Sequence, residues 1–165
     1  MFRRPAQEST HHAQAAAAVQ VVAIVNTVAE AAVAAGADKG DAVAKALDSL
    51  TGQIVAAADA STTTAAIDLT STSVIETVID ATTSGDSSVQ TAVNLVKSDI
   101  SAAVSKVNTA VSGITTSTGN ADLFYLTQSV LADSAASSVS AGSVSYTHLR
   151  AHETEADLVC RLLLE

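Results

Sequence analysis

The chain of 165 residues has few of the side chains on which catalysis and recognition usually depend. Phe, Trp and Tyr make up 2% of it, Trp is absent, and Cys and Pro occur once each. So few aromatic rings leave almost no surface on which bases or sugars could stack. A single Cys excludes a disulfide framework. Only 8 residues are Lys or Arg against 17 Asp or Glu, and the net charge of −9 argues against nucleic acids and anionic membranes as partners.

Motifs that bind phosphate, dinucleotides or a metal are missing as well. The sequence contains no phosphate-binding loop, Rossmann fingerprint, nucleophile elbow or metalloprotease helix. It also has neither an EF-hand loop nor a Gly/Asp nonapeptide repeat that would bind calcium. We therefore predict that the chain is not an enzyme, and we assign no catalytic, cofactor-binding or metal-binding residues and no cofactor.

The isolated acidic residues are explained better as helix caps than as a site. Glu76 and Asp80 lie one helical turn apart without a third acid beside them, whereas Asp38, Asp41 and Asp86 stand at the starts of predicted helices. A carboxylate in that position accepts hydrogen bonds from backbone N–H groups that have no partner inside the helix.

What the sequence does contain is helix-forming residues with apolar positions spaced three and four apart. Ala alone contributes 34 residues, so we expect a thin, Val-rich core. The pattern predicts an all-α fold, an antiparallel bundle of four to five helices with irregular termini, over residues 13–140. The expected helices cover 13–35, 41–58, two turns from Val74, 89–114 and 121–139, with Phe124 in the core and Tyr125 half exposed.

Local signals place the ends and faces of these helices. Gly36 should end the first helix, and the Asp41 carboxylate should cap the second. Two capping boxes, Ser73 with Glu76 and Ser87 with Gln90, should open the third and fourth. The predicted core faces consist of Val21, Val25, Val28 and Ala32 in the first helix and Val43, Leu47, Leu50 and Ile54 in the second.

The clearest pattern is a stripe of eight apolar residues that alternates spacings of three and four. It predicts one helix of 26 residues, which at 1.5 Å per residue would be about 39 Å long. Such a stripe could also support self-association as a coiled coil. The stripe consists of Val89, Val93, Val96, Ile100, Val104, Val107, Val111 and Ile114.

The first twelve residues carry no apolar periodicity, and we predict a disordered lead-in over residues 1–12 that includes the adjacent His11 and His12. Arg3, Arg4 and the apolar stretch that follows them resemble the start of a signal peptide. Internal polar residues argue against it, and Glu30 argues against a transmembrane span.

Composition changes abruptly near residue 143, and the last 22 residues resemble the translation of a transposon-type sequencing adapter. Val144 to His148 back-translates as GTC-TCT-TAT-ACA-CAT, and the rest keeps the same frame. We therefore predict an unstructured segment over 141–165 that is artefactual from Val144. That interpretation removes a tempting zinc pattern formed by His148, His152, Glu153 and Cys160.

Two segments, 17–27 (AAVQVVAIVNT) and 67–76 (IDLTSTSVIE), are similar to Ala/Val-rich helical segments of very large secreted bacterial surface proteins of the adhesin and repeats-in-toxin type. The resemblance covers about residues 15–135. It implies an extracellular or cell-surface location, a noncatalytic spacer or interaction module, and neighbouring domains of the same parent chain as partners. The alternative is a self-associating helical module similar to a phasin, flagellin or chemoreceptor segment, which would use the stripe from Val89 to Ile114.

Overall fold

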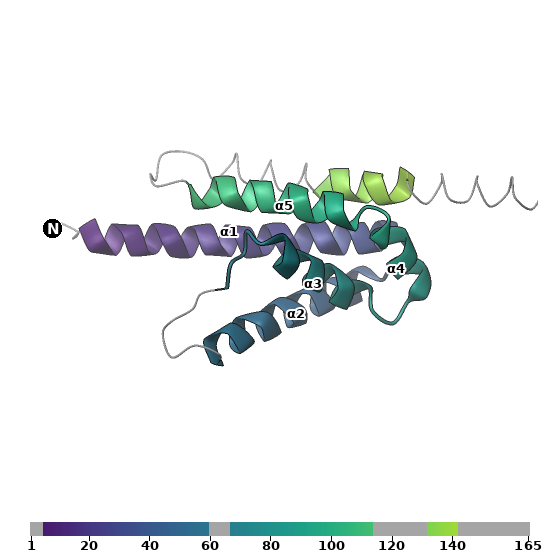
Figure 1. The fold of residues 1–165 in the computed structure, drawn as a ribbon, viewed down its shortest axis with the longest axis horizontal. Helices are drawn as coiled ribbons and strands as arrows, with labels where there is room; N and C mark the ends of the chain where they lie inside the picture. The colour runs from purple at the N-terminus through teal and green to yellow at the C-terminus, as the bar shows by residue number, and fades with distance from the viewer. Residues whose placement is uncertain (1–4, 60–66, 114–131, 142–165) are drawn as a thin grey trace, which may run out of the picture.

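The computed structural model describes residues 5–59, 67–113 and 132–141, and every regular element in these ranges is helical. This confirms the all-α class. Of the predicted last helix over 121–139, residues 121–131 lie outside the described ranges, as do Phe124, Tyr125 and residues 142–165. The elements are α1 (Pro5–Ala34), α2 (Lys39–Asp59), α3 (Thr72–Thr83), α4 (Ser87–Asn94) and α5 (Lys97–Ser112), followed by a helical segment over 132–141 (Figure 1).

Helix α1 begins at Pro5, so the prediction of a disordered lead-in is wrong for residues 5–12. Proline is favoured in the first turn of a helix, where its missing N–H would have no intrahelical acceptor. Ala6, Gln7 and Glu8 are good helix formers. The missing apolar periodicity, on which the prediction rested, bears on packing rather than on helix formation.

The predicted end of the first helix is confirmed. Gly36 has a φ of +106°, a conformation that costs glycine little because it has no Cβ. The turn closes with two backbone bonds, from Gly36 N to Val33 O and from Ala37 N to Ala32 O, each 2.9 Å long. This pair of bonds is a Schellman motif, which satisfies carbonyls that the ending helix leaves free.

Helix α1 supplies much of the core. Of its predicted face, Val25, Val28 and Ala32 are buried and Val21 is half-buried against them. Ile24 is also fully buried, because α1 contacts each of α2 to α5. By length and composition alone the stretch Ala13–Ala34 could cross a membrane, but half of its most apolar window is buried inside the protein.

Helix α2 buries a face that matches the predicted one only in part: Leu50 is buried and Val43 is half-buried against the core, as predicted. Its buried residues are Ala42, Ala46 and Leu50, whereas Leu47 and Ile54 remain 44% and 42% exposed. The prediction followed the largest side chains. In the structure small Ala side chains face the core, since they let α2 pack closely against α1 and α3.

Helix α3 lies between α2 and α5 and contributes Ile75, Val78 and Ile79 to the core. It begins at Thr72 with Ser71 as the N-cap, so the predicted capping box of Ser73 and Glu76 is wrong.

The 26-residue helix predicted over 89–114 is wrong, because α4 and α5 are separate helices joined through Leu95 and Val96. Val96, with φ −122° and ψ 7°, is not helical, and Leu95 is 52% exposed. Within the stripe Val89, Val93 and Ile100 are nevertheless all buried, so the same apolar positions reach the core from two shorter helices. The stripe residues described are therefore largely covered by the chain's own helices.

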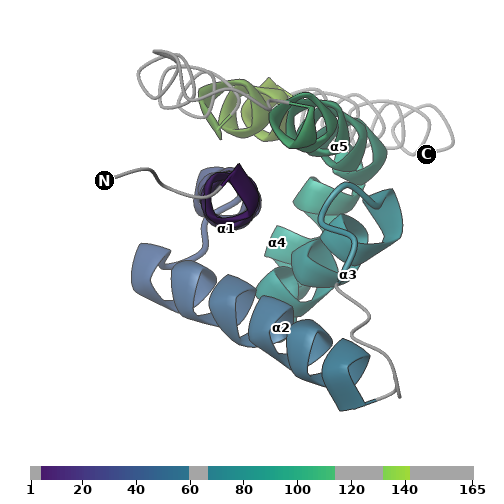
Figure 2. The ribbon, with the colours of Figure 1, turned by 90° about the vertical axis from the view of Figure 1, so that its left-hand side faces the viewer.

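The helices form three layers, which Figure 2 shows end-on. Helices α1 and α3 make up the middle layer together with α4, and each of α1 and α3 contacts all the other labelled helices. Helix α2 covers one side, while α5 and the 132–141 segment cover the other. Ala135 and Val139 of that segment join the core cluster.

Candidate functional site

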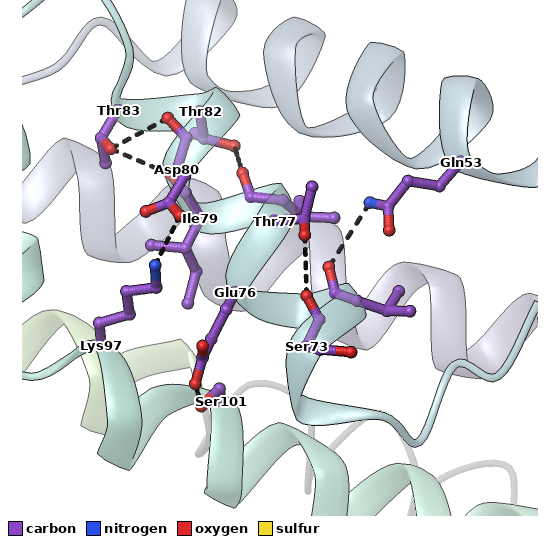
Figure 3. A network of polar contacts seen from close by, with 12 residues as sticks. Gln53, Ser73, Glu76, Thr77, Ile79, Asp80, Thr82, Thr83, Lys97 and Ser101 are labelled. Atoms are coloured by element: carbon purple, nitrogen blue, oxygen red, sulfur yellow. Dashed lines mark hydrogen bonds and ion pairs between the residues drawn. The ribbon is translucent and has the colours of Figure 1, made fainter. Parts of the chain in front are cut away.

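Two groups of polar side chains with tertiary partners lie where α5 meets the rest of the molecule. At the start of α5, facing α3, Ser101 Oγ donates to Glu76 Oε1 at 3.1 Å and Lys97 Nζ donates to Asp80 Oδ2 at 2.6 Å (Figure 3). Each helix supplies two residues one turn apart, and the order of the partners shows that α3 and α5 run in opposite directions there. We call these four residues the α3–α5 polar pairs.

The Ser101–Glu76 pair has the composition of a nucleophile and a base, but its surroundings do not suit that chemistry. Ser101 is 1% exposed, and its hydroxyl also lies 3.1 Å from Ser98 O, an acceptor in its own helix. A nucleophile must reach a substrate and needs oxyanion donors near the attacked atom. The backbone N–H groups of its own helix are engaged in helical hydrogen bonds, so within the described part of the chain this serine binds Glu76 and α5 offers it no oxyanion donor.

The second pair is an ordinary surface ion pair. The side chains of Lys97 and Asp80 are 22% and 51% exposed, so water and salt screen their attraction. Such pairs contribute about 1 kcal/mol or less to stability. The α3–α5 polar pairs thus fix the register of two helices and offer no chemistry beyond that.

At the other end of α5 lies a buried junction, which we define as Gln20, Asn108, Ser105 and the backbone of Leu69 and Thr70. Asn108 Nδ2 donates to Leu69 O at 2.7 Å, and Gln20 Nε2 donates to Asn108 O at 2.8 Å. Ser105 Oγ donates to Thr70 O. The junction therefore joins α1, α5 and the segment that leads into α3.

Burial makes this junction costly to break. Asn108 is 0% exposed and Gln20 is 7% exposed. Asn108 Oδ1 has no hydrogen-bond partner among the described residues, although Nδ2 of the same side chain is bonded. A buried polar atom without a partner costs about 1–3 kcal/mol, so the Leu69 and Gln20 contacts must offset that loss.

Two aspartates organise the turns on either side of α3. The Asp86 carboxylate accepts from Ser88 Oγ and from the backbone N–H groups of Ser88 and Val89, which caps α4. The Ser88 hydroxyl is the main cause that lowers the pKa of Asp86, followed by these N–H groups and the charge of Lys45. Lys45 Nζ itself donates to Ser84 O at 2.8 Å and so ties α2 to this turn.

Before α3, the side chain and backbone N–H of Thr70 lower the pKa of Asp68 by donating to its carboxylate. At the start of α2, Asp38 Oδ1 accepts from Asp41 N at 3.0 Å. The cap predictions for Asp38 and Asp86 are therefore confirmed. The prediction that the Asp41 carboxylate caps α2 is wrong, because the helix starts two residues earlier. The Ser87–Gln90 capping box is wrong too, since Asp86 is the cap.

No metal or catalytic cluster emerges from the residues that the structure describes. Among them no group of three or more His, Cys, Asp or Glu side chains could hold a metal ion. The side chains of His11 and His12 are not described, and His148, His152 and Cys160 lie in the undescribed tail.

Sequence reasoning missed both polar clusters. Glu76 and Asp80 at i, i+4, with Lys97 and Ser101 at the same spacing, formed a usable signal for matched pairs on two helices. Asn108 gave no local signal, because a polar residue on a helix looks solvent-exposed until the fold is known.

In comparisons with known proteins, no family model, no curated protein and no solved structure matches the chain.

Proposed function

We propose that the chain is a noncatalytic structural spacer or interaction module that holds neighbouring domains of one parent chain apart. The observation that carries this proposal is the path of the chain. Helix α1 starts at one end of the long axis, and the segment over 132–141 runs toward the opposite end (Figure 1). Domains joined to these two segments would lie on opposite sides of the bundle.

The length and the chemistry of the bundle agree with such a role. The 30 residues of α1 give a helix of about 45 Å, which forms the long axis of the molecule. The polar pairs, the buried junction and the caps all bond to other parts of this chain. The proposed mechanism is packing: the apolar faces fix the helices, and the polar groups fix their register.

The proposed setting is a large secreted or surface-attached bacterial protein of the adhesin type. It rests on the similarity of segments 17–27 and 67–76 to helical parts of such proteins. The low Lys content and the net negative charge fit an exported surface protein. The natural partners would then be the flanking domains.

Paired spin labels test whether the bundle separates its two ends. With Cys160→Ser removing the one thiol of the sequence, we would label Ala15→Cys and Ser140→Cys, both exposed positions. From the helix rise we expect one narrow distance distribution at about 30 Å that does not change when folded domains are attached at both ends. The control pair, Ala15→Cys with Ser112→Cys, should give a shorter distance because Asn108 bonds Gln20. A broad distribution, or equal distances for both pairs, would refute the spacer.

The setting has its own test, which is the source DNA across codons 143 and 144, read without adapter chemistry. We expect the frame to continue into different coding sequence that contains surface-protein repeats. If codons 144–165 are genomic, the tail is natural, and His148, His152 and Cys160 become the first residues to test for metal binding. If the flanking sequence encodes an intracellular enzyme, the adhesin setting is wrong.

A further inference from the structure

The exposed apolar side chains concentrate on one helix. Five large hydrophobic residues are well exposed in the described ranges, and three of them, Leu47, Ile54 and Val55, belong to α2 at 44%, 42% and 53% exposure. Scattered surface hydrophobics are ordinary, but three within three turns of one helix form a patch. This patch lies apart from the stripe of α4 and α5, which the chain's own core covers.

Two residues of the patch, Leu47 and Ile54, belong to a regular seam. Five exposed positions of α2 alternate spacings of three and four, which is the a/d pattern of a coiled coil. They lie to the side of the buried face formed by Ala42, Ala46 and Leu50. We call them the outer seam of α2: Ala44, Leu47, Thr51, Ile54 and Ala58.

The outer seam carries no charge. At 3.6 residues per turn, every charged residue of α2 points about 80° or more away from the centre of the seam. An uncharged, exposed strip on a chain of net charge −9 is unusual and favours apolar contact over charge pairing. The charged residues of α2 are Lys39, Asp41, Lys45, Asp48 and Asp59.

The order of side chains along the seam points to its occupant. The seam has the same order of side-chain sizes in both directions: a small residue, a large residue, Thr51, a large residue and a small residue. When two copies of α2 lie antiparallel with Thr51 on the two-fold axis, Leu47 faces Ile54 of the other copy, and Ala44 faces Ala58. A two-fold interface requires this property, because each copy must match itself.

We propose that a second copy of this chain packs on the outer seam of α2, antiparallel and centred on Thr51. The small residue at each end of the seam, Ala44 or Ala58, lets the helix backbones approach, while Leu47 and Ile54 supply the buried area. This inference does not depend on the spacer proposal, since a spacer could be monomeric or paired.

The area of the seam sets the strength of the pair. Its five side chains, of which two are large, offer much less area than the roughly 800 Å² per partner found in a standard stable interface. The dimer should therefore be weak and reversible, and its formation should depend on concentration. Since both copies are acidic and the seam is uncharged, added salt should strengthen the dimer by screening their repulsion.

Sedimentation velocity of the full chain with Cys160→Ser, from about 10 μM to 1 mM, measures this association. We expect the weight-average sedimentation coefficient to rise with concentration, and more steeply in high salt. Leu47→Lys should weaken dimerisation at least tenfold. The matched control Leu95→Lys, at a residue 52% exposed on another helix junction, should change it less than twofold. Circular dichroism would check that both variants keep their helix content.

Cysteine cross-linking tests the geometry independently of affinity. In the Cys160→Ser background, a mixture of Ala44→Cys and Ala58→Cys chains should form a heterodimeric disulfide, while Ala44→Cys alone should not cross-link. A disulfide needs Cβ atoms about 3.8 Å apart, so only a correct register is captured. Thr91→Cys, exposed on α4, is the negative control. The proposal is overturned by a monomer at every concentration, by an unchanged Leu47→Lys variant, or by Ala44→Cys linking only to itself, which would mean parallel packing.

Discussion

The two ends of α5 are held by polar contacts of opposite kinds. At its start Lys97 and Ser101 meet Asp80 and Glu76 of α3, and the ion pair is partly exposed, with 22% of the Lys97 side chain and 51% of the Asp80 side chain accessible to water. Near its end Asn108 binds Leu69 and Gln20 with almost no exposure. The number of bonds is similar at both ends, so burial decides how much each end contributes to stability.

The largest effect should come from the buried junction. Asn108→Ala removes the donor to Leu69 O and leaves a small cavity, but it also removes the unpartnered Oδ1, so we expect the free energy of unfolding to fall by about 2 kcal/mol. Urea denaturation followed by circular dichroism measures it. The control Asn94→Ala changes an exposed Asn on α4 and should cost about 0.5 kcal/mol or less. Equal losses in the two variants would show that burial does not separate the two sites.

An intermediate effect is expected at Ser101 and Glu76. Because Ser101 is buried while Glu76 is partly exposed, a double-mutant cycle of Ser101→Ala and Glu76→Ala should give a coupling free energy of about 1 kcal/mol. The same cycle with Glu30→Ala, whose carboxylate binds Lys39 instead, should give a coupling near zero. A coupling near zero for Glu76 as well would mean that their hydrogen bond adds no stability.

The ion pair should contribute least of the three α5 contacts. Lys97→Met is expected to lower the free energy of unfolding by about 1 kcal/mol or less, and the difference from wild type should shrink in 1 M salt because of screening. Lys106→Met, an exposed lysine on the same helix, is the control and should show no salt-dependent difference. The free energy of unfolding of both variants and of the wild type is measured at low salt and in 1 M salt. A loss in Lys97→Met that does not depend on salt would mean that Lys97 contributes through packing and not through its charge.

The smallest effect concerns the cap of α4 and appears only in acid. The lowered pKa of Asp86 means that the folded state binds fewer protons than the unfolded state below about pH 4. This contribution is therefore present at neutral pH and is lost as the pH falls through the folded pKa. In Asp86→Asn the stability should fall less steeply on acidification, and Ser88→Ala should do the same in part because it removes the main cause of the shift. Unchanged pH profiles would contradict this.

The sequence predicts those features of the fold that depend on neighbouring residues, and it fails for those that depend on how the helices pack. Helix periodicity predicts the all-α class and the core face of α1, and Gly36 marks a helix end, because both signals are local. The face of α2 was misjudged because Ala42 and Ala46 are buried through close backbone approach, which no hydropathy pattern records.

The join of α4 and α5 was missed for the opposite reason. The spacing of the stripe continues unbroken through Val96, and neither Gly nor Pro interrupts it, so only tertiary packing sets the break there. The α3–α5 polar pairs had a sequence signal in their i, i+4 spacing. The buried junction had none, since its partners are 88 and 39 residues apart.

The alanines between α1 and α2 also shape how this chain can change over time. Ala32 of α1 and Ala46 of α2 are fully buried in the core that these helices share, and a larger side chain at either position would have to displace its neighbours. In most cores the costly substitutions are those that remove side-chain volume. In this core the costly substitutions at the buried alanines are those that add volume. We therefore expect substitutions at these positions to be restricted to Ala, Gly and Ser. Close packing of the helices would then keep the sequence rich in small residues.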